Sequence, residues 1–424
     1  MKEIKIKGTD EIIIYDKCDN GLEIFIHVNE KINNFYATLT VKYGSVDTEF
    51  KVGKKKIKVP NGLAHFLEHL KFNQPDENAT EYFAKLGSCI NAVTSFEYTA
   101  YEVFAFNNFN ENINYLLDYV QTPYFTKGQV RMEKGIIIEE IKMYDDIPGS
   151  ILYSKTNECL FKKDNRRFLI SGDASDVRDT TYEHITEVYD TFYHPENMFI
   201  TITGNCNPEE TIALIKENQN KKDFSKYLNP IKIKEEEPIE VDTPLLELNH
   251  NVEFPKIKIA FKMARDNFKN LDNIDLKLYL NLILSNTFSG TSTLKEELLK
   301  NELISGDIAT VVTVRDNYVI LSIIVETNYP TELVKKIKDE IDSLSINKDN
   351  LERKKKASIA SFILRYDDIE AVNDEIQDSI ILYGEIIDDK IDRIKDINIT
   401  TAKKIIKGIK TDNYTTVIIY PFES

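Results

Sequence analysis

Two histidines and a glutamate stand within five residues of one another, at His65, Glu68 and His69. A helix of 3.6 residues per turn places all three side chains on one face. Two imidazoles four residues apart can bind one Zn²⁺ through neutral ring nitrogens, and a carboxylate beside them can take a proton from water. The spacing therefore predicts a hydrolytic zinc site with His65 and His69 as ligands and Glu68 as general base. The alternative is a solvated helix face that carries these residues by chance.

A catalytic zinc needs a third protein ligand and one open position. Glu133 and Glu140 are seven residues apart, two helical turns, so both side chains point the same way. We assign Glu140 as the third ligand and Glu133 as a carboxylate that orients a ligand or the water. Without the histidines, two surface glutamates on an amphipathic helix would be the better interpretation. The apolar stripe that packs this helix into a core is predicted to be Ile136, Ile137 and Ile141.

The elements that hold these residues follow from hydrophobic periodicity and turn residues. Alternating segments predict strands within residues 4–45, with a turn at Asp19-Asn20-Gly21, and strands at 90–95 and 99–106. The zinc helix follows Pro60-Asn61-Gly62, with Asn61 as its N-cap. Further helices are predicted at 78–86, 110–121 and 127–145.

A stretch rich in charge and proline, residues 228–246, is interpreted as a linker between two domains. It separates a zinc-bearing domain, residues 1–227, from a second domain, residues 247–424. A similar order of elements recurs in the second domain. It comprises strands at 256–263, 306–314 and 318–326 and helices at 271–287, 292–301 and 330–345. Because the second domain has no His-x-x-Glu-His pattern, the chain should hold one zinc site.

Length and composition agree with this organisation. A chain of 424 residues with 42% hydrophobic and 29% charged residues indicates a soluble protein of two or more domains. The net charge of −16 argues against nucleic acid and anionic membranes as partners. No apolar run is long enough to span a membrane, no signal peptide is evident, and the four cysteines are scattered. We therefore expect a cytoplasmic protein with reduced thiols.

Several stretches of the chain resemble the pitrilysin/insulinase family of metallopeptidases, whose zinc helix carries the inverted motif H-x-x-E-H. The family includes the mitochondrial processing peptidase and small bacterial proteins that work as pairs. The matching stretches are Gly62–His69, Asn91–Ser95 with Tyr98–Tyr101, Glu133–Ile141 and Phe192–Met198. The likeness covers nearly all of residues 20–220 and more weakly the rest. It implies an α+β fold of two homologous α/β domains, each a mostly antiparallel sheet covered by helices, which together form half of a clamshell.

The resemblance also implies how the substrate is held. In the family an extended peptide adds to a sheet edge through main-chain hydrogen bonds, and the matching contacts here are Asn91 and Ala92. Without the likeness, an ordinary edge strand would be the better interpretation. The implied activity is that of a zinc-dependent endopeptidase acting on peptides or leader peptides, with Zn²⁺ as its cofactor.

One departure from the family pattern concerns the second half of the chain. Complete active sites receive from that half an Arg and, seven residues later, a Tyr. Here Leu299 occupies the Arg position and Ser305 lies at or next to the Tyr position, while Arg315 and Tyr318 have the wrong spacing. Neither Leu299 nor Ser305 supplies a cation or a phenol. We therefore expect a homologous partner subunit to supply them, giving a heterodimer in which this chain bears the zinc.

An alternative function is a non-catalytic peptide-binding or scaffold subunit of the same fold. The intact His65, Glu68, His69 and Glu140 argue against that alternative. Leader-peptide maturation and general peptide degradation both remain open, as do the identity of the partner and the formation of a homodimer.

Overall fold

Two open β-sheets that share a five-strand pattern organise the chain in the computed structural model, which describes residues 1–422. Each sheet belongs to its own compact unit. Unit 1 consists of residues 1–141, 169–234 and 362–390, and unit 2 consists of residues 142–168, 235–361 and 391 onward. Each unit also has its own hydrophobic core, so each is described by itself.

The main sheet of unit 1 has seven strands in the order β1-β2-β3-β9-β4-β8-β7. Its strands are β1 (Lys2–Lys5), β2 (Ile12–Lys17), β3 (Glu23–Val28), β4 (Phe35–Val41), β7 (Cys89–Thr94), β8 (Thr99–Ala105) and β9 (Met198–Gly204). Neighbouring strands are antiparallel except β3 and β9, which are parallel. Strand β7 lies at one edge of this sheet and, in the described part of the chain, pairs with β8 alone. A small sheet is formed by β10 (Ile231–Lys232), β5 (Glu49–Val52) and β6 (Lys55–Lys58).

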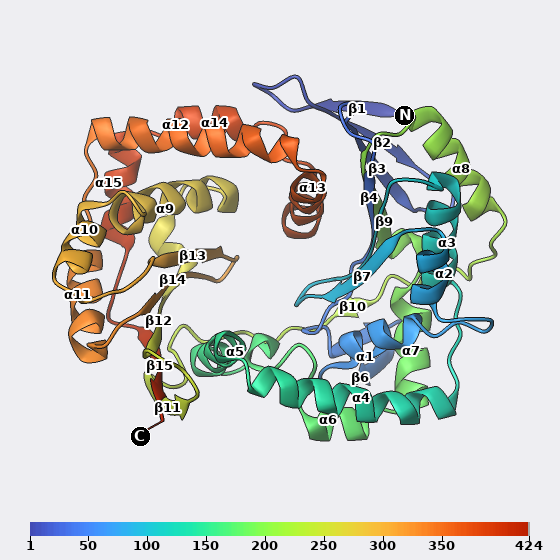
Figure 1. Ribbon diagram of the computed structural model, residues 1–424, viewed down its shortest axis with the longest axis horizontal. Helices are drawn as coiled ribbons and strands as arrows, with labels where there is room; N and C mark the ends of the chain where they lie inside the picture. Colours follow the sequence, from blue (N-terminus) through green and yellow to red (C-terminus); the bar gives the residue numbers. More distant parts are fainter. Residues whose placement is uncertain (423–424) are drawn as a thin grey trace. The chain divides into compact units, whose positions relative to one another are not determined.

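Helices cover both faces of the seven-stranded sheet. Helices α3 (Phe109–Gln121) and α8 (Pro208–Asn220) pack on one face, and α13 (Ile369–Tyr383) packs on the other face against β4 and β9 (Figure 1). The other helices of unit 1 are α1 (Leu63–Lys71), α2 (Ala79–Lys85), α6 (Ala174–Asp179), α7 (Tyr182–Phe192) and the 3₁₀ turns Pro195–Asn197 and Arg365–Asp367. Helix α4 (Lys127–Asp145) begins in unit 1 and ends in unit 2.

The sheet of unit 2 has the strand order β11-β15-β12-β14-β13. Its strands are β11 (Leu245–His250), β12 (Lys256–Ala264), β13 (Ala309–Val314), β14 (Tyr318–Glu326) and β15 (Tyr414–Pro421). Strands β11 and β15 are parallel, and the other neighbours are antiparallel. This pattern equals β3-β9-β4-β8-β7 of unit 1, which explains the recurring order of elements predicted from the sequence. Both sheets are mixed, each containing one parallel pair.

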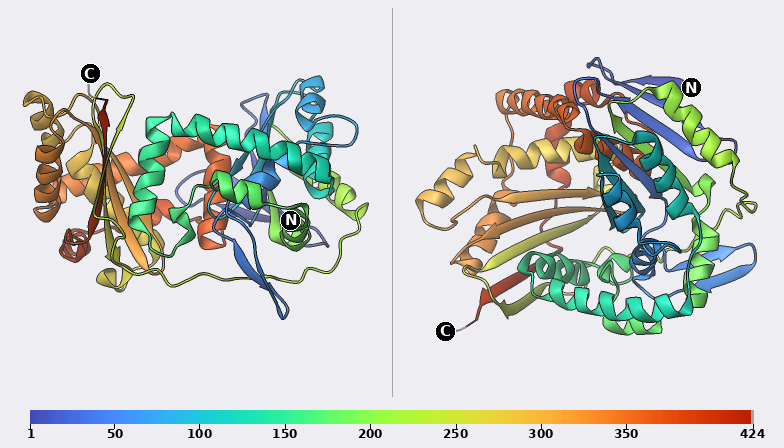
Figure 2. Two further views of the ribbon diagram at one scale, coloured as in Figure 1. Left: turned by 90° about the horizontal axis from the view of Figure 1, so that it is seen from below. Right: turned by 45° about the vertical axis from the view of Figure 1, so that its right-hand side comes forward.

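The alternation of side chains along β12 separates two helical layers of unit 2. Helices α9 (Asn273–Phe288) and α5 (Pro148–Leu160) lie on opposite faces of this sheet (Figure 2). Ile257, Ile259 and Phe261 belong to the core that contains α9, whereas Ala260 packs with Leu160 of α5. The other helices of unit 2 are α10 (Thr293–Lys300), α11 (Pro330–Asp342), α14 (Lys390–Asp396), α15 (Ile399–Gly408) and the 3₁₀ turns Asn165–Arg167 and Arg265–Phe268. Helix α12 (Lys348–Leu364) begins in unit 2 and ends in unit 1. Among residues 1–422, no helix is long and apolar enough to cross a membrane.

The compact units do not follow the predicted linear division into residues 1–227 and 247–424. Residues 142–168 belong to unit 2, and residues 362–390 return to unit 1. The return has a physical cause, because α13 buries apolar side chains on the sheet and Gln377 accepts a 2.7 Å hydrogen bond from Thr40. One passage between the units, after residue 234, falls inside the predicted linker at 228–246.

The predicted linker is anchored rather than free. Its Glu237 side chain is buried in unit 2 and accepts hydrogen bonds from Nζ of Lys262 at 2.6 Å and from the backbone N–H groups of residues 162–164. A buried ion pair needs such additional hydrogen bonds, because burial removes both charges from water. The linker therefore contributes to the interior of unit 2.

Most predicted elements are found within a few residues of their expected bounds, but the cap of the zinc helix differs. The N-cap of α1 is Gly62, at φ 76°, and not Asn61. A Cβ atom on Gly62 would lie 2.0 Å from the carbonyl oxygen of Ser171, so only glycine fits there. Asn61 instead donates its side-chain amide to the carboxylate of Asp176.

Candidate metal centre

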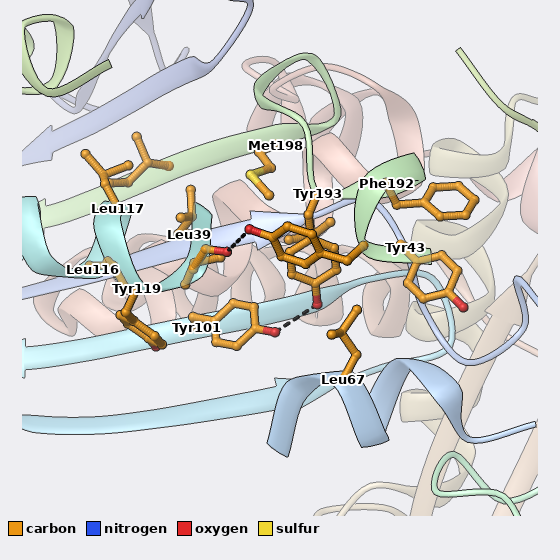
Figure 3. Close-up of a cluster of buried hydrophobic side chains, with 14 of the residues drawn as sticks. Leu39, Tyr43, Leu67, Tyr101, Leu116, Leu117, Tyr119, Phe192, Tyr193 and Met198 are labelled. Atoms are coloured by element: carbon orange, nitrogen blue, oxygen red, sulfur yellow. Dashed lines mark hydrogen bonds between the residues drawn. The ribbon is translucent and has the colours of Figure 1, made fainter. Parts of the chain in front are cut away.

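Helix α1 is held by an apolar face that lies opposite its polar residues. Leu63, Phe66, Leu67 and Leu70 are all buried in the core of unit 1. Leu67 points towards a cluster of buried aromatic side chains that includes Tyr43, Tyr101, Tyr119, Phe192 and Tyr193 (Figure 3). The hydroxyl groups of Tyr101 and Tyr193 are 2.8 Å apart and form a hydrogen bond. This packing fixes the rotation of α1 about its axis and so directs His65 and His69 towards α4.

Helix α4 supplies the two predicted carboxylates. Val130, Ile137 and Ile141 form its buried apolar stripe together with the aliphatic part of Glu133. Ile136 was predicted to belong to this stripe, but it is 55% exposed. It lies about 100° around the helix from Ile137, which turns it away from the core. The stripe places the carboxylates of Glu133 and Glu140 beside α1.

His65, His69 and Glu140 converge on one point, with one ligand atom of each within 4.8 Å of the others. Oε2 of Glu140 lies 3.7 Å from Nε2 of His65 and 3.2 Å from Nε2 of His69. That oxygen is buried and has no well-formed hydrogen-bond partner. Two imidazole nitrogens and one carboxylate oxygen are a donor set typical of catalytic zinc. The residues present therefore fit Zn²⁺, and a bound ion would satisfy the buried oxygen.

Glu133 is not part of the converging group but contacts one of its members. Its Oε1 atom is 2.9 Å from Nδ1 of His69. A hydrogen bond at Nδ1 holds the proton on that nitrogen and leaves Nε2 with a free lone pair, which is the tautomer that can bind a metal through Nε2.

The ionisable groups of the centre influence one another strongly. Burial, together with the neighbouring His69, lowers the pKa of His65 to about 4. Burial opposes protonation of His69 as well, but the carboxylates of Glu133 and Glu140 outweigh it and raise the pKa of His69 to about 10. His69, in turn, holds the pKa of Glu140 below its usual value. The two carboxylates therefore favour the protonated form of His69, whereas burial favours the neutral form of His65.

Glu68 lies beside the converging group without belonging to it. Its side chain is buried, with the residue 7% exposed, and its Oε2 accepts a 2.6 Å hydrogen bond from Oγ1 of Thr94. Burial raises the pKa of Glu68, although the hydrogen bond from Thr94 acts in the opposite direction. Sequence reasoning did not single out Thr94. The two-residue alternation of its strand could have done so, because Thr94 shares a face with Ala92, which packs against the core.

Asn91 and Ala92 lie on β7, the edge strand of the main sheet of unit 1. Their side chains point to opposite faces. Ala92 packs against the core, whereas Asn91 is exposed and lies opposite Glu102 of β8. Within residues 1–422, β7 pairs only with β8, so its outer edge offers backbone groups to an added strand.

The residues at the predicted Arg and Tyr positions of unit 2 provide neither a cationic donor nor a phenol. Leu299 lies on α10 and is 42% exposed, and Ser305 follows the end of that helix. Tyr318 is 3% exposed, and its hydroxyl group donates to Asp164 at 3.3 Å within unit 2.

Comparison with known proteins places these features in a family. Residues 36–167 match the model of insulinase (peptidase family M16), and residues 179–358 match that of the M16 inactive domain. The chain is 34% identical over 366 residues to the zinc protease YmfH of Bacillus subtilis (strain 168), covering 84% of this chain and 85% of YmfH. It is also 27% identical over 161 residues to a mitochondrial-processing peptidase subunit beta of Arabidopsis thaliana, covering 37% of this chain and 30% of that subunit.

The fold agrees with these matches. A crystal structure of an M16-like peptidase from Alicyclobacillus acidocaldarius superimposes with a TM-score of 0.91 at 24% identity, covering 98% of this chain and 100% of that chain. The zinc predicted from the histidine spacing is thus confirmed by the zinc protease relatives and by the His65, His69 and Glu140 group. The chain belongs to the insulinase, or M16, family of zinc peptidases.

Proposed function

We propose that this chain is the zinc-bearing subunit of an endopeptidase that cleaves extended peptides beside β7. The observation that carries the proposal is the convergence of His65, His69 and Glu140 on one point, next to a buried Glu68. These three residues would hold Zn²⁺, with Glu133 orienting His69. When bound, the ion supplies a Lewis acid that activates water and polarises a carbonyl group.

Glu68 is the proposed general base, because it lies beside the metal group and its pKa is raised by burial. It accepts a proton from the attacking water on its carboxylate and later delivers that proton to the amine of the departing peptide fragment. A carboxylate whose pKa is raised by burial holds the proton better than an exposed carboxylate. The hydrogen bond from Thr94 occupies Oε2, which keeps the side chain in one orientation.

The exposed edge of β7 is the proposed site for the substrate backbone. A peptide that adds as a further strand would hydrogen-bond through its main chain, at the level of Asn91 and Ala92. Such binding reads the extended shape of the peptide more than its side chains. The proximity of β7 to the metal group is supported by the contact between Thr94 and Glu68.

We further propose that activity requires a homologous partner subunit. The support is that Leu299 and Ser305 cannot donate a hydrogen bond from a guanidinium or a phenol, while the hydroxyl group of Tyr318 is already bound to Asp164. One relative is itself named as a subunit beta. Donors that stabilise the developing oxyanion would then come from the partner.

The test is a cleavage assay with quenched fluorescent peptides, performed on this chain alone, on a homologous chain from the same organism and on both together, each with zinc. We expect cleavage to require both chains and to disappear in the Glu68→Gln variant. Full activity of this chain alone would refute the partner requirement but leave the peptidase assignment in place. Absence of cleavage by the zinc-loaded pair over a broad peptide library would overturn the peptidase assignment.

A further inference from the structure

We propose that Thr94 is a positioning residue that sets the orientation of Glu68 and thereby connects the peptide-binding edge strand to the general base. The inference rests on the proposed function of Glu68. It assigns to Thr94 a role that acts through Glu68 and involves no contact with the reacting atoms.

The contact itself is short and well shielded. Oγ1 of Thr94 donates to Oε2 of Glu68 at 2.6 Å, and Glu68 is almost fully buried. A hydrogen bond from a neutral hydroxyl group to a buried carboxylate is stronger than one between neutral groups. The glutamate side chain has three rotatable bonds, and this hydrogen bond fixes its end. The second carboxylate oxygen is then held in one direction relative to His65 and His69.

Thr94 can hold the Glu68 carboxylate in one orientation because hydrogen bonds fix the backbone that follows Thr94. The turn that follows β7 accepts hydrogen bonds from Ser45 N–H to Ser95 O at 3.0 Å and from Val46 N–H to Phe96 O at 3.1 Å. At Gly44 the two chain segments touch, since a Cβ atom there would lie 2.4 Å from Phe96 O. This close approach requires glycine and ties the turn to residues 44–47.

The segment 44–47 is itself held in place by hydrogen bonds to the Asp47 carboxylate. The buried carboxylate of Asp47 accepts a hydrogen bond from Gly44 N–H at 3.0 Å and one from Nζ of Lys232 at 2.7 Å. A connected set of contacts therefore runs from the Asp47–Lys232 ion pair through the turn at 95–98 to Thr94 and Glu68. A substrate strand on β7 would add to the same backbone that carries the Thr94 hydroxyl group.

The chain offers a matched control for Thr94. Thr99 lies directly opposite Thr94 in the β7–β8 register. Its Oγ1 also donates a hydrogen bond, but to the backbone oxygen of Tyr43, at 3.0 Å. Thr99→Val removes a buried hydroxyl group from the same hairpin without touching Glu68. Thr94→Val removes the donor that faces Glu68 at nearly constant shape, and Thr94→Ser retains that donor.

The variants are tested in the active enzyme, with its partner if one is required, at equal zinc content. We expect Thr94→Val to lower kcat about 10-fold to 100-fold with KM changed less than about 3-fold, because small displacements of a catalytic group reduce the rate by such factors. Thr94→Ser should retain most of kcat, and Thr99→Val should lose stability without losing kcat. A Thr94→Val enzyme with unchanged kcat, or a Thr94→Ser enzyme as impaired as Thr94→Val, would overturn the proposal.

A second measurement does not depend on activity. Urea unfolding midpoints are compared for the metal-free Thr94→Val, Glu68→Ala and double variants of this chain. If the hydroxyl group and the carboxylate share one hydrogen bond, the midpoint loss in the double variant is smaller than the sum of the two single losses. Additive losses would show that the contact is absent and would overturn the proposal even if the enzyme is active. Coupled losses in a protein without peptidase activity would instead support the contact while the proposed function fails.

Discussion

Nδ1 of His69 lies 2.9 Å from Oε1 of Glu133, seven residues before the carboxylate that approaches the other side of the same ring. One helix thus contributes both a carboxylate that contacts Nδ1 of His69 and a carboxylate that converges with His65 and His69. Glu133 and Glu140 are two helical turns apart on α4. Their carboxylates therefore reach different nitrogens of the His69 ring, Nδ1 and Nε2 respectively.

Replacing Glu133 by Gln should weaken zinc binding by about 10-fold to 100-fold, since the loss of a carboxylate behind a ligating histidine has effects of that size. The amide retains an acceptor but removes the charge that makes the ring a better ligand. Competition with a chromogenic chelator measures the affinity. The exposed Glu139→Gln on the same helix serves as the control, and an equal affinity of both variants would contradict the assigned role.

The Glu68→Gln variant should retain zinc in full and lose peptide cleavage by at least 1,000-fold, roughly the scale of a general base together with the positioning around it. The amide keeps the volume of the side chain but cannot take up a proton. Metal analysis and the peptide assay are made on the same preparation. Substantial turnover in that preparation would exclude Glu68 as the base.

Removal of a metal ligand should abolish zinc binding, in contrast to Glu68→Gln, which should leave zinc binding intact. His65→Ala and Glu140→Ala are expected to lose zinc on dialysis, because two remaining protein ligands cannot hold the ion. Metal content by atomic emission, with Glu139→Ala as the neighbouring control, gives the answer. If Glu140→Ala kept one zinc per chain with the affinity of the unchanged protein, another residue would have to be the third ligand.

Zinc binding should release close to one proton per ion at pH 7. His69, with its pKa raised to about 10, is protonated in the metal-free protein, and a metal binds only the neutral ring. His65, with its pKa lowered to about 4, is already neutral and contributes no proton. The apparent affinity should therefore rise about tenfold per pH unit between pH 7 and 9. Calorimetry in buffers of different ionisation enthalpy counts the protons, and a value near zero would argue against a charged His69.

Asp374→Asn should stabilise the protein at pH 8. Asp374 stands between Glu370 and Asp378 on α13, and burial together with these two carboxylates raises its pKa to about 6. A raised carboxyl pKa means that the folded protein holds this proton more tightly than the unfolded chain. The contribution of Asp374 to stability is therefore lost as the pH rises from about 4 through about 6.

Since the Asp374 side chain is only partly buried and still reaches solvent, which screens the repulsion, the expected gain in unfolding free energy at pH 8 is only about 1 kcal/mol, and it should vanish towards pH 4. Denaturant titrations at both pH values measure it, with Asp10→Asn on an exposed bend of unit 1 as the comparison. A gain of equal size at pH 4 would show that the effect is not electrostatic.

The sequence alone determined the features that depend on spacing within one element. The positions of His65, Glu68 and His69 on one helix face, and of Glu133 and Glu140 on another, follow from the helical repeat. Likewise, the alternation of residues 90–95 and 99–106 predicted β7 and β8 almost to their ends. These features are local, because covalent geometry relates neighbouring residues whatever surrounds them.

Only the tertiary structure decided which of these faces meet. It brought Glu140 to the histidines, Thr94 to Glu68 and α13 back to the sheet of unit 1, and it required glycine at position 62, where Ser171 approaches. Each of these contacts joins residues that are far apart in the chain. They depend on how buried side chains fill a shared core, which the spacing within a single segment does not specify.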